Sequence, residues 1–109
     1  MSYSSDLDLI SAQKTVTAAG TAEPLATGRP SEMRTQLLII KALTTNAGKI
    51  YVGNGTVSST TGLDLDPGDV ITYEVEPEEW ENNIAINMSM IWIDSDNNGE
   101  GVVYQYRRE

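Results

Sequence analysis

Apolar and polar residues alternate over short stretches of this chain, and turn-forming residues separate the stretches. Lys49–Val52 is a β-branched and aromatic run that ends at a Gly-Asn-Gly turn, whose residues accept positive φ angles at little cost. The next run, Thr56–Leu65, ends at an Asp-Pro-Gly-Asp turn, where proline presets φ for the first corner. Val70–Glu76 then alternates as a half-buried strand does. This pattern predicts β-strands joined by tight turns.

Two further stretches supply the predicted core. Arg34–Leu43 carries four consecutive apolar residues that fit a helix or a strand by periodicity alone, but β-branching, length and flanking turns favour a buried strand. In Ile84–Asp94 one alternating face carries the large residues, which places Met88, Met90 and Trp92 in the core, the methionines as gap-filling residues.

Eight strands are expected in all, at short and regular spacing. Such a series is typical of an all-β domain, and we predict a single antiparallel β-sandwich with a jelly-roll-like arrangement. The expected strands are Lys14–Ala19, Leu25–Thr27, Arg34–Leu43, Lys49–Val52, Thr56–Leu65, Val70–Glu76, Ile84–Asp94 and Gly101–Arg107.

The chain begins with a segment that lacks sustained periodicity, which we interpret as an N-terminal arm over residues 1–12, followed by the sandwich domain over residues 13–109. The arm holds a small apolar cluster of Leu7, Leu9 and Ile10, which a segment this short cannot bury by itself. The arm is therefore either a frayed terminus or a segment docked on a neighbouring subunit.

Length and composition limit the possible functions. With 109 residues the chain fits one domain with one modest core, and with no cysteine it has no disulfide framework or thiolate metal site. The start resembles no signal peptide, and no apolar run reaches the ~18 residues of a membrane-spanning helix, so we expect a protein without membrane contact. The formal net charge of −9 argues against direct binding to nucleic acid.

The charge is unevenly placed along the chain. Residues 13–53 hold five basic and two acidic residues, whereas residues 54–81 hold eight acidic and no basic ones. This asymmetry is either a solvated face or a docking surface. If it is a docking surface, we expect Arg29, Arg34 and the arm to make the contact, with the acidic tract facing solvent or a basic neighbour.

One stretch imitates part of a calcium-binding loop. Asp94, Asp96 and Asn98 supply oxygen atoms at the first, third and fifth positions, a glycine follows at the sixth, and Glu100 is close behind. The twelfth position is Gln105 instead of a bidentate glutamate, and it lies in an expected strand. A hairpin turn needs the same Asn-Gly chemistry, so turn and calcium site both remain possible interpretations.

Few residues indicate catalysis. Without histidine or cysteine there is no Ser-His-Asp triad, Cys-His pair or ordinary zinc site, and we expect neither an enzyme nor a cofactor. Trp80 stands in an acidic loop, where it is either a lid over the core or an anchor for a partner.

The order of these turns and strands resembles small structural proteins of tailed bacteriophages, in particular head decoration or cement proteins. The resemblance covers about residues 13–106 and departs from the family at Pro77–Asn83, which looks like an enlarged loop. The segments that carry it are Ala18–Ala22, Lys49–Gly53, Val57–Leu63, Leu65–Asp69, Ile91–Asp94 and Gly99–Tyr104.

The resemblance implies a β-sandwich that forms a homotrimer on the outside of a phage head and reinforces contacts between major capsid subunits. The protein would be made in the host cytoplasm and would reside in the virion, at the capsid surface. The alternative is a tail or fibre component that binds carbohydrate on the host surface, with Trp80 and Tyr73 stacking on sugar. Copies per virion would separate the two.

Overall fold

The computed structural model of the chain describes residues 8–108 and the side chains of residues 9–107. The described residues consist mainly of strands, with one short α-helix and two single turns of 3-10 helix. The strands are β1 (Asp8–Thr15), β2 (Glu23–Pro24), β3 (Arg34–Thr35), β4 (Leu37–Ala42), β5 (Ile50–Gly53), β6 (Leu63–Leu65), β7 (Val70–Glu74), β8 (Ile86–Asn87), β9 (Trp92–Ser95) and β10 (Gly101–Arg108). The helix is α1 (Pro77–Glu81), and the 3-10 turns are Pro30–Glu32 and Met88–Met90.

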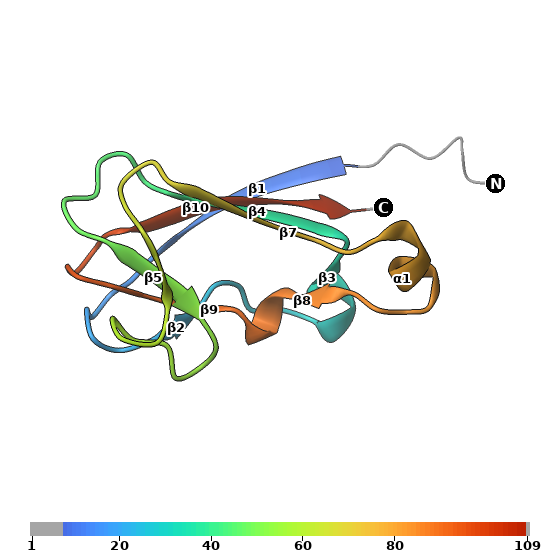
Figure 1. Ribbon diagram of the computed structural model, residues 1–109, viewed down its shortest axis with the longest axis horizontal. Helices are drawn as coiled ribbons and strands as arrows, with labels where there is room; N and C mark the ends of the chain where they lie inside the picture. The colour runs from blue at the N-terminus through green and yellow to red at the C-terminus, as the bar shows by residue number, and fades with distance from the viewer. Residues whose placement is uncertain (1–7, 109) are drawn as a thin grey trace.

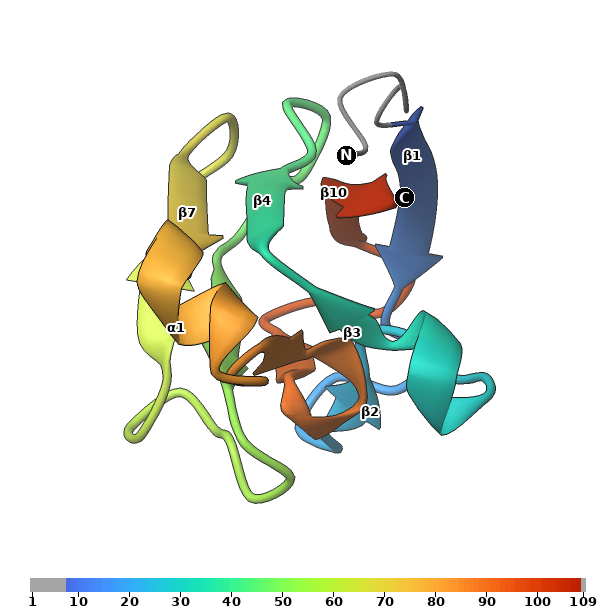
Figure 2. The same ribbon diagram turned by 90° about the vertical axis from the view of Figure 1, so that its right-hand side faces the viewer.

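All strand pairs are antiparallel, so the predicted all-β class is confirmed. Sheet A has the order β1-β10-β4-β7, and sheet B has the order β2-β9-β5-β6. Figure 1 shows the two sheets lying one above the other along a molecule with extents of 47 × 24 × 22 Å. The short pair β3-β8 lies toward the end that carries α1, which faces the viewer in Figure 2.

The core lies between the sheets and is built by alternation. Residues directly opposite in an antiparallel pair share a face, so Ile40, Tyr104 and Ile71 line the inner face of sheet A together. Ile50 and Ile93 come from sheet B, and both side chains are fully buried. Arg34–Leu43 is thus correctly predicted as a core segment, although it divides into β3 and β4.

The first strand differs from the prediction. β1 begins at Asp8 and ends at Thr15, so it includes Asp8–Ala12 of the expected arm and only the start of the expected strand Lys14–Ala19. Its register with β10 is unbroken from Asp8, opposite Arg108, to Thr15, opposite Gly101. The partner strand therefore extends β1 into a segment whose own pattern is too weak to predict a strand.

The stretch Ile84–Asp94 is also corrected. The 3-10 turn Met88–Met90 interrupts the expected strand, and the Asn87 side chain begins it by accepting a hydrogen bond from the Ser89 N–H at 3.1 Å. A one-residue change of phase moves every following side chain to the opposite face. Met88 is fully buried as predicted, but Met90 is 68% exposed, Trp92 is half-buried, and Ile93 occupies the core.

Most of Thr56–Leu65 is not a strand. Only Leu63–Leu65 pairs with β5, while the Ser58 and Thr61 side chains bond to one another and to the local backbone. Serine and threonine hydroxyls offer the backbone this alternative to a strand ladder. The expected strand Leu25–Thr27 is likewise absent, because β2 is confined to Glu23–Pro24.

Candidate functional site at the β9–β10 turn

The turn between β9 and β10, residues 96–100, joins two loops that are distant from it in sequence. Asn46 anchors the first loop: its side-chain amide donates to the Gly101 carbonyl at 2.9 Å and accepts from the Gly101 N–H at 3.2 Å. Asn46 is buried, so these two bonds are shielded from water. They fix the loop 46–49 against the first residue of β10.

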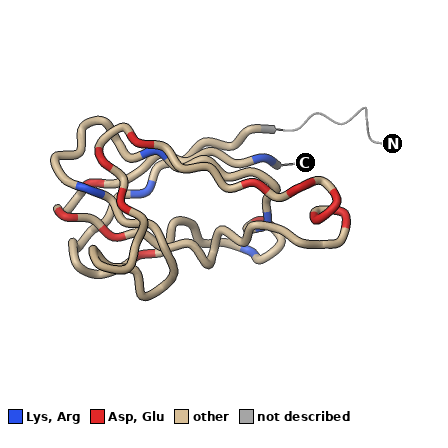
Figure 3. The backbone as a smooth tube through the Cα atoms, in the orientation of Figure 1, with Lys and Arg blue, Asp and Glu red and all other residues tan. Residues whose placement is uncertain are grey.

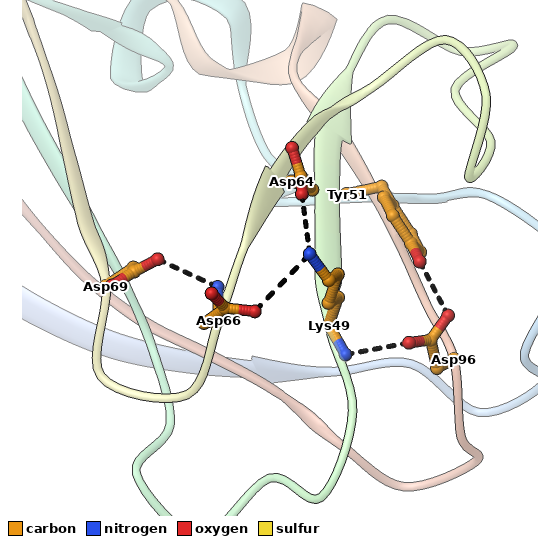
Figure 4. Close-up of polar contacts among 6 residues, drawn as sticks. All are labelled: Lys49, Tyr51, Asp64, Asp66, Asp69 and Asp96. Atoms are coloured by element: carbon orange, nitrogen blue, oxygen red, sulfur yellow. Dashed lines mark hydrogen bonds and ion pairs between the residues drawn. The ribbon is translucent and has the colours of Figure 1, made fainter.

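Two carboxylates of the turn hold the same loop through its backbone. Glu100 accepts from the N–H groups of Ala47 at 2.6 Å and Gly48 at 3.1 Å. Asp96 accepts from the Lys49 N–H at 2.9 Å and from the Tyr51 hydroxyl at 2.7 Å, as Figure 4 shows. These carboxylates therefore satisfy backbone donors that would otherwise depend on water.

These hydrogen bonds also shift the pKa values of the groups that form them. The Lys49 N–H, followed by the Tyr51 hydroxyl, lowers the pKa of Asp96, because both donors stabilise its charged form. The Ala47 N–H is the main cause of the lowered pKa of Glu100, with Asn97 second. The hydrogen bond to Asp96 raises the pKa of the Tyr51 hydroxyl. The site thus favours ionised carboxylates at neutral pH.

The loop 16–20 is bound on the other flank of the turn. Asn98 accepts from the Ala19 N–H at 2.7 Å, and the Gly99 N–H donates to the Val16 carbonyl at 2.7 Å. Asp94, which is buried at the end of β9, accepts from the Gly20 N–H at 2.8 Å. Asp94, Asp96, Asn98 and Glu100 therefore accept from different backbone N–H groups.

Lys49 carries the only positive charge in Figure 4. Its ammonium group donates a hydrogen bond to Asp64 at 2.8 Å and lies 3.5 Å from a carboxylate oxygen of Asp66. These ion pairs join the start of β5 to β6 and to the turn that follows β6. The hydrogen bond with Asp64 raises the pKa of Lys49 and lowers that of Asp64. All three side chains are largely exposed, so the stabilisation from these ion pairs is small.

This geometry supports the turn interpretation of the calcium-like stretch. The oxygens of Asp94, Asp96, Asn98 and Glu100 are directed to separate N–H and O–H donors. Within the part of the chain that the structure describes, no three acidic side chains are grouped so that they could hold a metal ion. In the structure these side chains join the turn to the loops 16–20 and 46–49.

The residues expected to contact a partner lie elsewhere. Leu7 is outside the described residues; Leu9 is 62% exposed on β1, and Ile10 is half-buried on the inner side of that strand. Arg29 is exposed next to the 3-10 turn Pro30–Glu32. Arg34 donates to both the carbonyl and the side chain of Asn83, at 2.9 and 2.8 Å, which ties β3 to the segment after α1.

The basic residues of the first half and the acidic residues of the middle do not lie on two separate faces of the molecule. The hydrogen bonds between Arg34 and Asn83 bring the basic first half next to the acidic loop, and Figure 3 shows basic and acidic residues together at the α1 end. Arg34 and the acidic loop are therefore close neighbours at this end, and which of them contacts a partner stays a prediction. The β3-β8 pair brings Arg34 close to the segment after α1, because it places Arg34 opposite Asn87.

The two aromatic candidates have different surroundings. Trp80 is half-buried on α1, where no residue is fully buried. Tyr73 packs against the core from sheet A, and burial raises the pKa of its hydroxyl. Tyr73 thus lies on the inner face of its sheet.

Sequence reasoning missed three members of the site, namely Asn46, Tyr51 and Lys49. The sequence pattern indicated only a strand for Lys49 and Tyr51, and it gave no reason to single out Asn46. An asparagine before Ala-Gly carries no signal in the sequence that its partner is Gly101, because only strand pairing brings residues 46 and 101 together.

Comparison of the chain with protein-family models, with curated proteins and with solved structures finds no match. Over the described residues, no helix has both the length and the apolar character needed to cross a membrane.

Proposed function

We propose that this chain is a capsid decoration protein, which binds the outer surface of a phage head as a homotrimer and stabilises contacts between major capsid subunits. In this role the protein catalyses nothing, and its partners are the major capsid protein and further copies of itself. The chain's own resemblance to such proteins motivates the proposal, and three features of the fold support it.

The first supporting feature is the order of the strands. When the separate pair β3-β8 is set aside and the remaining strands are counted in chain order, sheet A contains the first, eighth, third and sixth strands, and sheet B the second, seventh, fourth and fifth. We take this order as support for an eight-stranded jelly roll, an architecture found in viral capsid and lectin domains. We infer a jelly roll here, consistent with a virion component.

The observation that carries the proposal is the exposed apolar surface on the outside of sheet A. Leu9 is 62% exposed on the edge strand β1, and Val70 is half exposed on β7. Val70, Ile39 and Val103 line a groove of about 190 Å³ on this sheet, together with Lys41 and Gln105. Association with another subunit would remove this surface from water, which favours binding by roughly 25 cal/mol per Å² of apolar area.

The third supporting feature is rigidity near the turns. Carboxylates, which an enzyme would present in a cleft, are here bonded to loop backbone, as with Asp96 and Glu100. A small subunit with fixed loops loses little entropy on binding, and symmetry multiplies its contacts.

The carbohydrate-binding alternative receives less support. It requires Trp80 and Tyr73 as exposed stacking surfaces, but Tyr73 lies on the inner face of sheet A against the core. The remaining candidate is Trp80 alone. A sugar site generally needs a platform with polar groups around it, so decoration remains the better-supported function.

The test of the proposal is occupancy of purified heads lacking the protein, measured by co-sedimentation, together with the melting temperature of decorated and bare heads. The variant Leu9→Asp should reduce occupancy at least about tenfold, because burying one leucine contributes roughly 1.5–3 kcal/mol. Leu63→Asp is the matched control, since Leu63 is 57% exposed but belongs to sheet B. Unchanged occupancy for Leu9→Asp, or no rise in melting temperature on decoration, would contradict the proposal.

The contribution of the N-terminal segment needs a deletion that ends at Leu7. Deleting residues 1–12 would remove most of β1 and its pairing with β10, and so would confuse folding with docking. Deleting residues 1–7 leaves β1 whole, and we expect intact folding with weaker occupancy. Sedimentation of the purified chain tests the homotrimer independently.

The basic residues are tested by charge reversal. Arg29→Glu should weaken attachment, and more strongly at low salt, where Coulomb interactions are least screened. Arg34→Glu is informative only if its melting temperature shows that loss of the Asn83 bonds leaves the fold intact. Reversal of Glu78 and Glu79 should have a smaller effect on occupancy.

A further inference from the structure

The chain contains two Asn-Gly pairs, Asn54-Gly55 and Asn98-Gly99, and the structure places them in different environments. An asparagine followed by glycine can modify itself, because the glycine nitrogen attacks the side-chain carbonyl carbon and no Cβ hinders its approach. The rate depends on whether that nitrogen is free and whether the developing charge on the amide oxygen is stabilised. Both conditions can be compared within one molecule.

Asn54 meets both conditions. It is exposed and begins a β-turn, in which its own carbonyl accepts from the Val57 N–H at 2.9 Å. Its side-chain oxygen accepts from the Thr56 N–H at 3.0 Å and from the Thr56 hydroxyl at 2.8 Å. Among the described residues, no group accepts a hydrogen bond from the Gly55 N–H.

Asn98 fails the first condition. The Gly99 N–H, which would have to attack, donates to the Val16 carbonyl at 2.7 Å. Gly99 is held at a φ of 80°, and the Asn98 side chain is bound to the Ala19 N–H at 2.7 Å. Attack would require breaking the bond to Val16 and moving a turn that joins two loops.

We propose that Asn54 is a self-modification site, at which the chain converts an amide into a carboxylate in its native state. The Gly55 nitrogen forms a bond to the Asn54 Cγ and loses its proton, while the two Thr56 donors stabilise the oxyanion. The C–N bond to the side-chain nitrogen then breaks, ammonia leaves, and a cyclic imide remains. Water opens the imide at either carbonyl and leaves aspartate or isoaspartate.

The change alters both charge and shape in the loop between β5 and β6. A neutral side chain becomes an anion, and isoaspartate inserts a methylene into the backbone. A Cβ built on Gly55 would lie 3.6 Å from the Trp92 ring, so this ring is adjacent to the affected backbone. Trp92 fluorescence therefore reports on the conversion.

The experiment is incubation of the full chain at neutral and mildly alkaline pH, followed by peptide mapping by mass spectrometry in water labelled with ¹⁸O. Asn54 should convert at least about tenfold faster than Asn98, because a tenfold change in rate corresponds to the free energy of one hydrogen bond of ordinary strength. The product should carry one labelled oxygen and include isoaspartate. In concentrated urea the two sites should convert at similar rates, because both are then flexible Asn-Gly pairs.

Variants test the site itself and the role of the Thr56 hydroxyl in stabilising the amide oxygen. Asn54→Gln should abolish conversion at residue 54 and leave Asn98 unaffected. Thr56→Ala should slow conversion several-fold through loss of the hydroxyl donor, whereas Thr56→Ser should retain the native rate. Native rates that are equal at Asn54 and Asn98, or faster at Asn98, would overturn the proposal, and an unchanged rate in Thr56→Ala would remove the role assigned to the hydroxyl.

Discussion

The two ends of the molecule are both acidic, but their carboxylates make different contacts. At the β9–β10 end, Asp96 and Glu100 accept hydrogen bonds from loop residues about fifty positions away in sequence. At the α1 end the carboxylates act locally: the Glu79 side chain accepts from the Glu76 N–H at 3.1 Å in a capping box. The difference lies in what each carboxylate joins, and composition does not reveal it.

This difference predicts which substitutions lower the stability of the whole fold and which act only locally. Residues that join distant segments contribute to the whole structure, since breaking their contacts frees a loop that then no longer supports its neighbours. Residues that cap a five-residue helix affect that helix alone. The following substitutions test the comparison, from the largest expected effect to the smallest.

The largest effect is expected from Gly101→Ala. A Cβ at this position would overlap the Lys14 carbonyl oxygen and would lie 2.7 Å from the Thr15 Cα, and backbone atoms cannot move aside as a flexible side chain can. We expect a loss of about 3 kcal/mol or more in the free energy of unfolding, measured by urea denaturation. Gly99→Ala is the control: its surroundings are open, so only the strain of its φ of 80° applies, at about 1–2 kcal/mol. Equal losses would show that β1 and β10 are not as closely packed at Gly101.

Asn46→Ala should have the next largest effect. The substitution removes both hydrogen bonds to Gly101 and leaves a buried N–H without its partner, which costs about 2 kcal/mol. Amide exchange should also rise at Ala47 and Gly48, whose N–H groups depend on the loop position. A loss confined to this loop, with unchanged global stability, would contradict the structural role assigned to the turn.

The acid dependence of stability tests the carboxylates of the turn. The pKa values of Asp96 and Glu100 are lower in the folded protein than their ordinary values of 3.8 and 4.5. The unfolded chain therefore binds protons first as the pH falls, so the stabilisation present at neutral pH is lost progressively below those ordinary values. Asp96→Asn should lower stability at neutral pH and flatten the dependence on pH.

The control for this acid experiment is Asn98→Ala. It removes the bond to the Ala19 N–H without removing a titratable group, so its loss of stability should be the same at every pH. Chemical denaturation at several pH values measures both variants. A pH dependence of Asp96→Asn that matches the unsubstituted chain would show that another carboxylate causes the acid sensitivity.

Much of the fold follows from local sequence signals. The run around Leu38 and Ile40 and the final strand from Gly101 were predicted because β-branched alternation and flanking turns agree there with the tertiary structure. The start of β1 was missed because its pairing with β10 supplies what local propensity lacks. The phase of β9 was missed because Asn87 begins a 3-10 turn that pattern counting treats as strand.

Only part of the candidate site could be predicted from the sequence, for a similar reason. The oxygen-bearing residues from Asp94 to Glu100 are conspicuous in the sequence, but their partners are backbone N–H groups, which every residue possesses. No residue type marks Ala47 or Ala19 as a donor. Only the approach of the loops, set by strand order, shows which N–H groups these oxygens contact.

The smallest effect on stability is expected from Trp80→Ala at the α1 end. Trp80 is half-buried and no residue of α1 is fully buried, so we expect a loss of about 1 kcal/mol or less, measured by urea denaturation. Met88→Ala is the core control, with an expected loss of about 2–5 kcal/mol, because the Met88 side chain is fully buried. A large loss for Trp80→Ala would identify the tryptophan as a lid over the core. A small loss combined with reduced occupancy of heads would identify it as an anchor for a partner, since an exposed aromatic contributes to binding chiefly when the partner covers it.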